Sequence, residues 1–101
     1  MTPPTRASER WLAALPACNT SLYRRKLKEG GRPVFALTPV ATDHLPEWWF
    51  LVVDRDGAIF RVISDTSPFC RRTTSLKLVY RTARTAGLET LTLPIETKGK
   101  P

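Results

Sequence analysis

The chain is poor in the residues that build metal sites and cross-links. Its 101 residues include only two cysteines and one histidine. Cys18 and Cys70 form no C-x-x-C pair, and His44 cannot complete a cysteine–histidine zinc set. A disulfide is disfavoured in a reducing compartment. We therefore expect no metal, no cofactor and two free, at least partly buried thiols.

Long apolar runs are also missing. The longest, Trp48–Val53, has six residues, far short of the roughly 18 that suggest a membrane-spanning helix. The first residues, Met-Thr-Pro-Pro-Thr-Arg, lack the apolar stretch of a secretory signal. The sequence thus predicts a cytoplasmic protein with no membrane partner.

Signatures of catalysis are equally few. Asp54-Arg55-Asp56-Gly57 superficially resembles a calcium loop, but its glycine comes fourth, where an EF-hand has it sixth. Ile95-Glu96-Thr97-Lys98 has the form of a metal-dependent nuclease motif, on terminal residues that would hold a catalytic pair poorly. Neither a nucleophile elbow nor a phosphate-binding glycine loop is present. We expect no catalytic residues, and not an enzyme.

Negative charge is scarce, with nine Asp+Glu against sixteen Lys+Arg and a net charge of +7. The excess is segregated: +4 over residues 1–46, −2 over residues 47–70 and +5 over residues 71–101. Two basic flanks around a mildly acidic, apolar centre favour a polyanionic partner.

The clearest structural signal is a central β-hairpin. Trp48–Val53 and Ala58–Ile63 are rich in β-branched and aromatic residues, and the turn between them ends at Gly57, which we expect to have a positive φ. The extended stretch Val34–Val40 precedes the hairpin. Pro39 near its end predicts an edge strand, because proline donates no ladder hydrogen bond.

The remaining segments are assigned from caps, breakers and apolar spacing. Pro68 indicates a loop after the hairpin, and the alternation of Leu91, Leu93 and Ile95 indicates a final strand. The predicted segments are helices over 8–15, 20–29 and 76–86, loops over 41–46 and 65–69, and a strand over 88–95.

This pattern predicts an α+β fold. A small, mostly antiparallel sheet is made of the central hairpin plus an edge strand and a C-terminal strand. One amphipathic helix packs on it, and two short helices precede it. The single domain covers residues 8–95, between a flexible arm at 1–7 and a loose tail at 96–101.

The predicted helix over 76–86 has a basic stripe, because Lys77, Arg81 and Arg84 recur at i, i+4 and i+7. Arg71 and Arg72 lie just before it, and residues 71–84 contain no acid. Like charges at this spacing cost roughly 0.2–0.5 kcal/mol per pair in an isolated helix. A polyphosphate partner would offset that cost.

A second basic cluster, Arg24, Arg25 and Lys28, is predicted on the outer side of the helix over 20–29. Two short helices ahead of a basic loop also admit a helix-turn-helix motif. The spacing fits poorly, however, and no third helix follows to complete a core. A basic surface without a groove-reading helix is the preferred interpretation.

The adjacent Trp48 and Trp49 alternate across their strand, so one of them can face away from the core. An exposed ring beside Arg55 or Arg61 could stack on a base or anchor a protein interface. The alternative is that helices cover both faces of the sheet and both rings belong to the core.

We therefore predict a small basic nucleic-acid-binding protein that contacts phosphates, with DNA preferred over RNA as the partner. Arg71–Pro94 resembles small accessory proteins of bacterial plasmids, which favours that setting. The alternative is a protein–protein or homodimerisation module that uses the aromatic sheet surface, with the basic face serving solubility.

Overall fold

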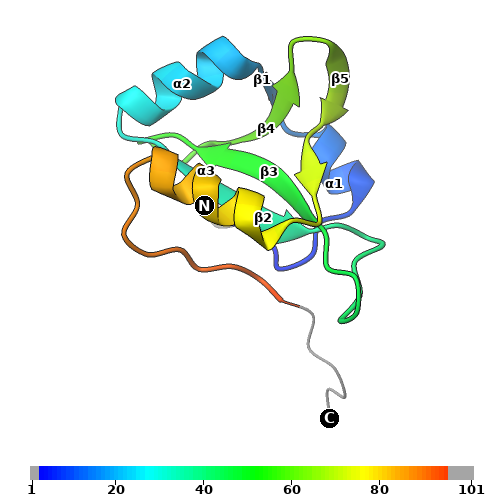
Figure 1. Ribbon diagram of the computed structural model, residues 1–101. Helices are drawn as coiled ribbons and strands as arrows, with labels where there is room; N and C mark the ends of the chain where they lie inside the picture. The colour runs from blue at the N-terminus through cyan, green and yellow to red at the C-terminus, as the bar shows by residue number, and fades with distance from the viewer. Residues whose placement is uncertain (1–2, 96–101) are drawn as a thin grey trace.

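Figure 1 shows the computed structural model of the protein, which describes residues 3–95. The fold is α+β, as predicted: a six-stranded mixed sheet with helices on both faces. In chain order the elements are α1 (Glu9–Ala13), β1 (Ala17–Cys18), α2 (Thr20–Lys28), β2 (Arg32–Leu37), β3 (Trp48–Val53), β4 (Ile59–Ser64), β5 (Ser67–Cys70), β6 (Arg72–Thr73) and α3 (Leu76–Thr85).

Each helix begins at a polar residue of a type that commonly caps helices. The side chains of Ser8, Asn19 and Ser75 accept hydrogen bonds from backbone N–H groups three residues further along, which satisfies donors that a helix start otherwise leaves unpaired. Gly87, with φ of 81°, follows the end of α3. Local signals therefore set the start of each helix in residues 3–95 and the end of α3.

The sheet has the strand order β1-β4-β3-β2. β3 and β4 form the predicted hairpin, and Gly57 has the expected positive φ, 90°. β2 pairs with β3 over all six of its residues and is an edge strand, as predicted. The Leu37 N–H points away from β3 and donates to the Thr5 carbonyl. Pro33 is an even number of residues from Leu37, so its missing N–H would also point away from β3, and the β2–β3 ladder loses no hydrogen bond.

Three short strands were not predicted. β1 pairs with β4 in parallel, β5 pairs with β4, and β6 pairs with the start of β3. The prediction of a loop over 65–69 was wrong from Ser67 onward. β5 accommodates Pro68 beside a register shift at Ile63/Ser64, where the ladder is already interrupted.

The predicted strand over 88–95 was also wrong. This segment runs past α3 without strand structure. Leu91 and Leu93 pack against the core, and Pro94 accepts a hydrogen bond from the Trp48 indole at 2.8 Å. The alternation in the sequence therefore reflects one-sided packing instead of strand pairing.

Residues 5–7, which the sequence assigned to a flexible arm, are bonded to the end of β2. The Thr5 carbonyl accepts from Leu37 N–H at 2.8 Å, and Ala7 N–H donates to the Leu37 carbonyl at 2.9 Å. The Arg6 guanidinium donates to the carbonyls of Thr38 and Ala41. The tail predicted over 96–101 lies outside the described residues.

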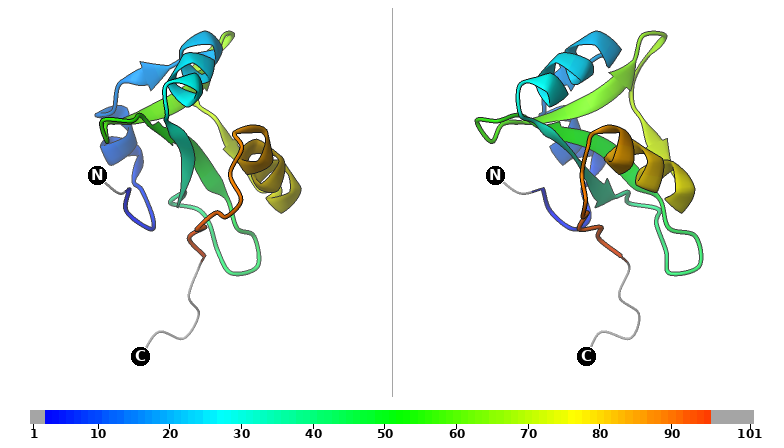
Figure 2. Two further views of the ribbon diagram at one scale, coloured as in Figure 1. Left: turned by 90° about the vertical axis from the view of Figure 1, so that its left-hand side faces the viewer. Right: turned by 60° about the vertical axis from the view of Figure 1, so that its left-hand side comes forward.

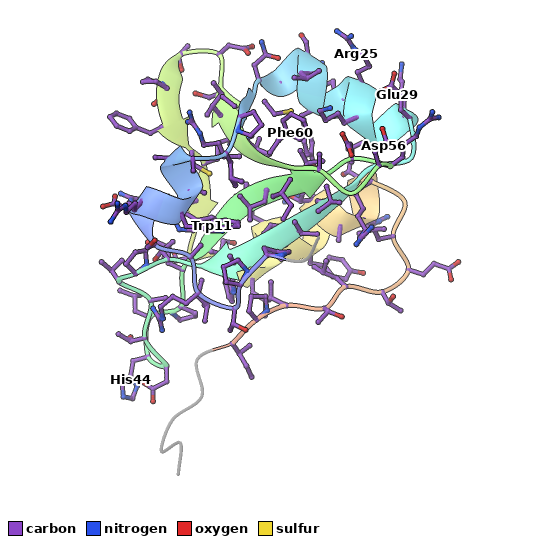
Figure 3. The ribbon with its side chains drawn as sticks, turned by 180° about the vertical axis from the view of Figure 1, so that it is seen from behind. Trp11, Arg25, Glu29, His44, Asp56 and Phe60 are labelled. Atoms are coloured by element: carbon purple, nitrogen blue, oxygen red, sulfur yellow. The ribbon has the colours of Figure 1, made fainter. Side chains whose placement is uncertain are left out.

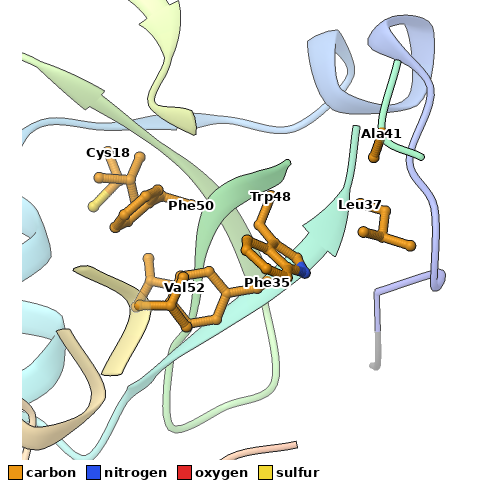
Figure 4. Packing of buried hydrophobic residues seen from close by; sticks show 9 residues of the cluster. Cys18, Phe35, Leu37, Ala41, Trp48, Phe50 and Val52 are labelled. Carbon is orange, nitrogen blue, oxygen red and sulfur yellow. The ribbon is translucent and has the colours of Figure 1, made fainter. Parts of the chain in front are cut away.

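The sheet separates two apolar clusters. The cluster under α2 and α3 includes Phe35, Trp48, Phe50 and Val52 (Figure 4). The other, under α1, includes Trp49 and Leu51 and their neighbours. Figure 2 shows α1 on the opposite side of the sheet from α3. We call these sides the α2/α3 face and the α1 face.

Within residues 3–95, no helix is long and apolar enough to span a membrane.

Candidate nucleic-acid interface

The outer side of α3 carries three exposed cations. Val79 and Ala83 point into the core, with 1% and 7% of their surface exposed. Lys77, Arg81 and Arg84 lie on the opposite arc of the helix, and no carboxylate in residues 3–95 forms an ion pair with them. α3 itself contains no acid, so its positive charge is not neutralised locally.

α2 presents a second set of exposed cations. Its inner side packs Leu22, Tyr23 and Leu27 against the core. The outer side carries Arg24, Arg25 and Lys28, again without an ion pair to any carboxylate between residues 3 and 95. Arg25 projects away from the sheet (Figure 3).

Lys26 is the exception on α2. Its ammonium lies 3.6 Å from Asp54 Oδ2 and 3.9 Å from the centre of the Phe60 ring. Its side chain is only 13% exposed. This lysine therefore joins α2 to the hairpin, and its charge is already paired.

Both helices pack on the same apolar cluster, so they cover the same side of the sheet (Figures 1 and 2). The sequence separates the two sets of cations by about fifty positions. The fold brings them to the same side of the sheet. The six cations of the α2/α3 face are Arg24, Arg25, Lys28, Lys77, Arg81 and Arg84.

Arg71 lies on the same side of the sheet but precedes α3, so it is not one of the six helix cations. Its guanidinium carbon lies 5.3 Å from the centre of the Phe50 ring, in the cluster beneath α2 and α3. Burial raises the pKa of the Tyr23 phenol on α2, and the nearby Arg71 charge partly offsets that rise. Arg71 therefore lies within electrostatic reach of α2 and adds to the positive charge there.

Arg72 does not join the other predicted cations. Its Nε lies 3.7 Å from Glu47 Oε2, and its guanidinium carbon is 5.8 Å from the centre of the Trp49 ring, on the α1 face. Neighbouring residues of an extended chain point to opposite sides, which separates Arg72 from Arg71. The grouping of these two arginines was therefore wrong.

Both tryptophans are buried, so both rings belong to the core, and the alternative in which one ring faces away from it is wrong. Trp48 is 3% exposed and Trp49 is 4% exposed. Trp48 donates to the Pro94 carbonyl, and Trp49 donates to the Ala7 carbonyl at 3.2 Å. They do alternate across the strand, but α1 covers one ring and α3 with its following segment covers the other.

The helix-turn-helix alternative is also excluded. α1 packs on one face of the sheet and α2 on the other, so the two helices cannot form the paired unit that the motif requires.

Other reactive groups are dispersed. His44 lies in an exposed loop, 3.8 Å from Asp43 Oδ1. Burial raises the pKa of the Cys18 thiol and raises that of Cys70 to about 11, so both are protonated at neutral pH. In the described part of the chain no three His, Cys, Asp or Glu gather as a metal site. Glu96 and Lys98 of the nuclease-like motif lie outside the described residues.

One residue of the basic face was missed. The i, i+3, i+4, i+7 spacing of Leu76, Val79, Tyr80 and Ala83 predicts one apolar side of the helix over 76–86, yet Tyr80 and Leu76 are 67% and 61% exposed. The helix is turned so that Val79 and Ala83 face the core. Tyr80 is adjacent to Arg81 and three residues after Lys77, which was the available signal that it borders the basic stripe.

Comparison of the chain with protein-family models, with curated proteins and with solved structures finds no match. Function is therefore argued from the charges and contacts described above.

Proposed function

We propose that the protein binds nucleic acid through the α2/α3 face, chiefly by contacts with phosphates. The supporting observation is that the six cations of this face extend from two neighbouring helices without a carboxylate partner in residues 3–95. Lys and Arg side chains that neutralise phosphates release condensed counterions, which drives association. Exposed hydroxyls at Thr74, Ser75 and Thr85 border the stripe and can donate to phosphate oxygens.

We also propose that DNA is preferred over RNA as the partner, that the protein binds nucleic acid without catalysing a reaction, and that it acts in the cytoplasm. A role among plasmid accessory proteins rests on the resemblance of residues 71–94 and is part of the same proposal.

The competing function, a protein–protein or dimerisation module, was based on an exposed aromatic sheet surface. Trp48 and Trp49 are buried, so that surface has lost its anchor. The oligomeric mass, measured with and without nucleic acid, tests whether self-association has some other basis.

The proposed function is tested by the salt dependence of duplex DNA binding. If each of the six cations neutralises one phosphate, log K falls with log salt concentration with a slope of about −5. The triple variants K77Q/R81Q/R84Q and R24Q/R25Q/K28Q should each reduce the slope by about 2.7, since each phosphate contributes about 0.9.

The matched control removes the same charge elsewhere. R10Q/R32Q/R72Q changes three exposed cations that lie on α1, at the start of β2 and beside Trp49 on the α1 face, and it should leave most of the affinity in place. Binding that is indifferent to salt would overturn the proposal. So would a control that weakens binding as much as the helix variants, because net charge alone would then explain the result.

A further inference from the structure

An apolar pocket of about 390 Å³ lies beside the basic stripe of α3, between this helix and the segment that follows it. Pockets that hold small ligands in proteins have volumes of roughly 300–1,000 Å³. The apolar part of the lining comes from Leu76, Val79, Ala83, Leu88, Leu91 and Leu93.

One cation and one aromatic ring line this pocket. Tyr80 and Arg84 line it directly, and Arg84 also belongs to the basic stripe. Tyr80 is 67% exposed and is the residue immediately before Arg81. The Tyr80 ring is not part of either apolar cluster in residues 3–95, and the pocket beside it is largely apolar. An accessible aromatic ring therefore lies within the surface that we propose for phosphates.

We infer that this pocket receives an unpaired base of a single-stranded nucleic acid, stacked on Tyr80, while the adjoining phosphates lie on Lys77, Arg81 and Arg84. The inference rests on the proposed function and specifies the form of nucleic acid. Single-strand binders combine cations that follow the backbone with aromatic rings on which bases stack. A duplex keeps the faces of its bases covered, so it can use the cations but not the ring.

Glu89 fits this assignment. It lines the same pocket and is exposed. Its carboxylate would repel a phosphate that entered the pocket, whereas it can accept a hydrogen bond from an N–H group on a base edge. The charges around the pocket thus direct the base inward and leave the phosphates on the stripe. An acidic protein would supply negative charges to the basic stripe, but it has no planar base beside each charge to occupy the pocket.

The test compares Tyr80→Ala with Tyr80→Phe on three labelled probes: a single DNA strand of mixed sequence, the RNA strand of the same sequence, and the DNA duplex. Stacking of one base on an aromatic ring corresponds to roughly a 5- to 150-fold change in affinity. Tyr80→Ala should weaken single-strand binding by about this factor and leave duplex binding unchanged. Tyr80→Phe keeps the ring and should bind both as the original protein does.

A second readout reports stacking directly. A fluorescent adenine analogue in the single strand should be quenched by the original protein and by Tyr80→Phe, but not by Tyr80→Ala at saturation. A thermal unfolding curve confirms that Tyr80→Ala is folded, which its exposure leads us to expect.

The results distinguish a failure of the base site from a failure of nucleic-acid binding by the basic face. If Tyr80→Ala leaves single-strand binding intact, or weakens strand and duplex equally, the pocket is not a base site even though the basic face binds nucleic acid. If no probe binds with salt dependence, the proposed function itself fails. Quenching of the DNA strand, the RNA strand or both identifies which sugar the site accepts.

Discussion

The two faces of the sheet use their cations differently. On the α1 face, the Arg61 guanidinium donates to the carbonyls of Leu15 and Pro68, at 3.0 and 3.3 Å. Arg72 on the same face pairs with Glu47. On the α2/α3 face, six cations extend outward without carboxylate partners in the described chain.

The difference shows that net charge alone says little about a binding surface. An arginine whose donors are already engaged by carbonyls and carboxylates holds the fold together. An arginine on the outside of a packed helix keeps its donors for a partner. Arg10 and Arg32 are also exposed, but they stand apart from any stripe, and Arg10 follows Glu9 in α1.

The largest expected effect tests whether the tryptophans belong inside. Trp48→Ala and Trp49→Ala should each lower the free energy of unfolding by about 3–5 kcal/mol, because each removes a buried ring. A domain has roughly 5–15 kcal/mol in total. Urea denaturation measures the loss. Tyr80→Ala, with its ring outside, should change the free energy of unfolding by less than about 1 kcal/mol. Similar losses at all three positions would contradict the contrast between inner and outer rings.

A smaller effect contrasts two arginines. Arg61→Ala leaves the carbonyls of Leu15 and Pro68 without their donor, so it should lower the free energy of unfolding by about 1–3 kcal/mol. Arg81→Ala should change it by no more than about 0.5 kcal/mol. Arg61→Lys keeps the charge but not the forked donor geometry, so it should restore little of the loss.

The affinity for nucleic acid should show the reverse order: Arg81→Ala should lower it more than Arg61→Ala does. If Arg61→Lys is as stable as the original protein, charge and not hydrogen-bond geometry explains the role of Arg61.

The smallest effect concerns the one paired lysine of α2. The pKa of Asp54 is lowered, first by the hydrogen bond from the Ala58 backbone N–H, then by that from Asp56 and by the nearby Lys26 charge. A carboxyl with a lowered pKa stabilises the fold above its unfolded pKa of about 3.9, and this contribution is lost as the pH falls through the folded pKa.

Asp54→Asn should thus be less stable than the original protein at neutral pH, and the difference in the free energy of unfolding should close on acidification. Unfolding curves across this range measure it, with Asp56→Asn as the exposed control. A gap that is constant with pH would mean that the Asp54 charge is not involved.

The parts of the fold that the sequence predicted correctly depend on local signals. Gly57 marks the hairpin turn, and Ser75 caps α3, because both act within a few residues of their position. The short strands depend on distant partners instead. β6, for example, consists of two residues and exists because Arg72 pairs opposite Trp49. Two residues carry no periodicity from which such a pairing could be read.

The candidate site was predictable in composition but not in arrangement. The stripe of Lys77, Arg81 and Arg84 follows from helical spacing alone. Whether α2 lies on the same face as α3 depends on the crossing from β1 into α2, which no local pattern encodes. The burial of Trp49 likewise depends on α1, which packs over a strand some forty positions away in the sequence.

The hydrogen bond from the Trp48 indole to Pro94 sets a lower bound on how far the chain can be trimmed. Nothing after Thr85 is helix or strand in the described part, so this stretch resembles a dispensable appendage. A truncation after Gly87 would deprive a buried indole N–H of its acceptor and uncover the apolar residues that Leu91 and Leu93 protect. A chain cut after Gly87 should therefore be less stable than one that extends through Pro94.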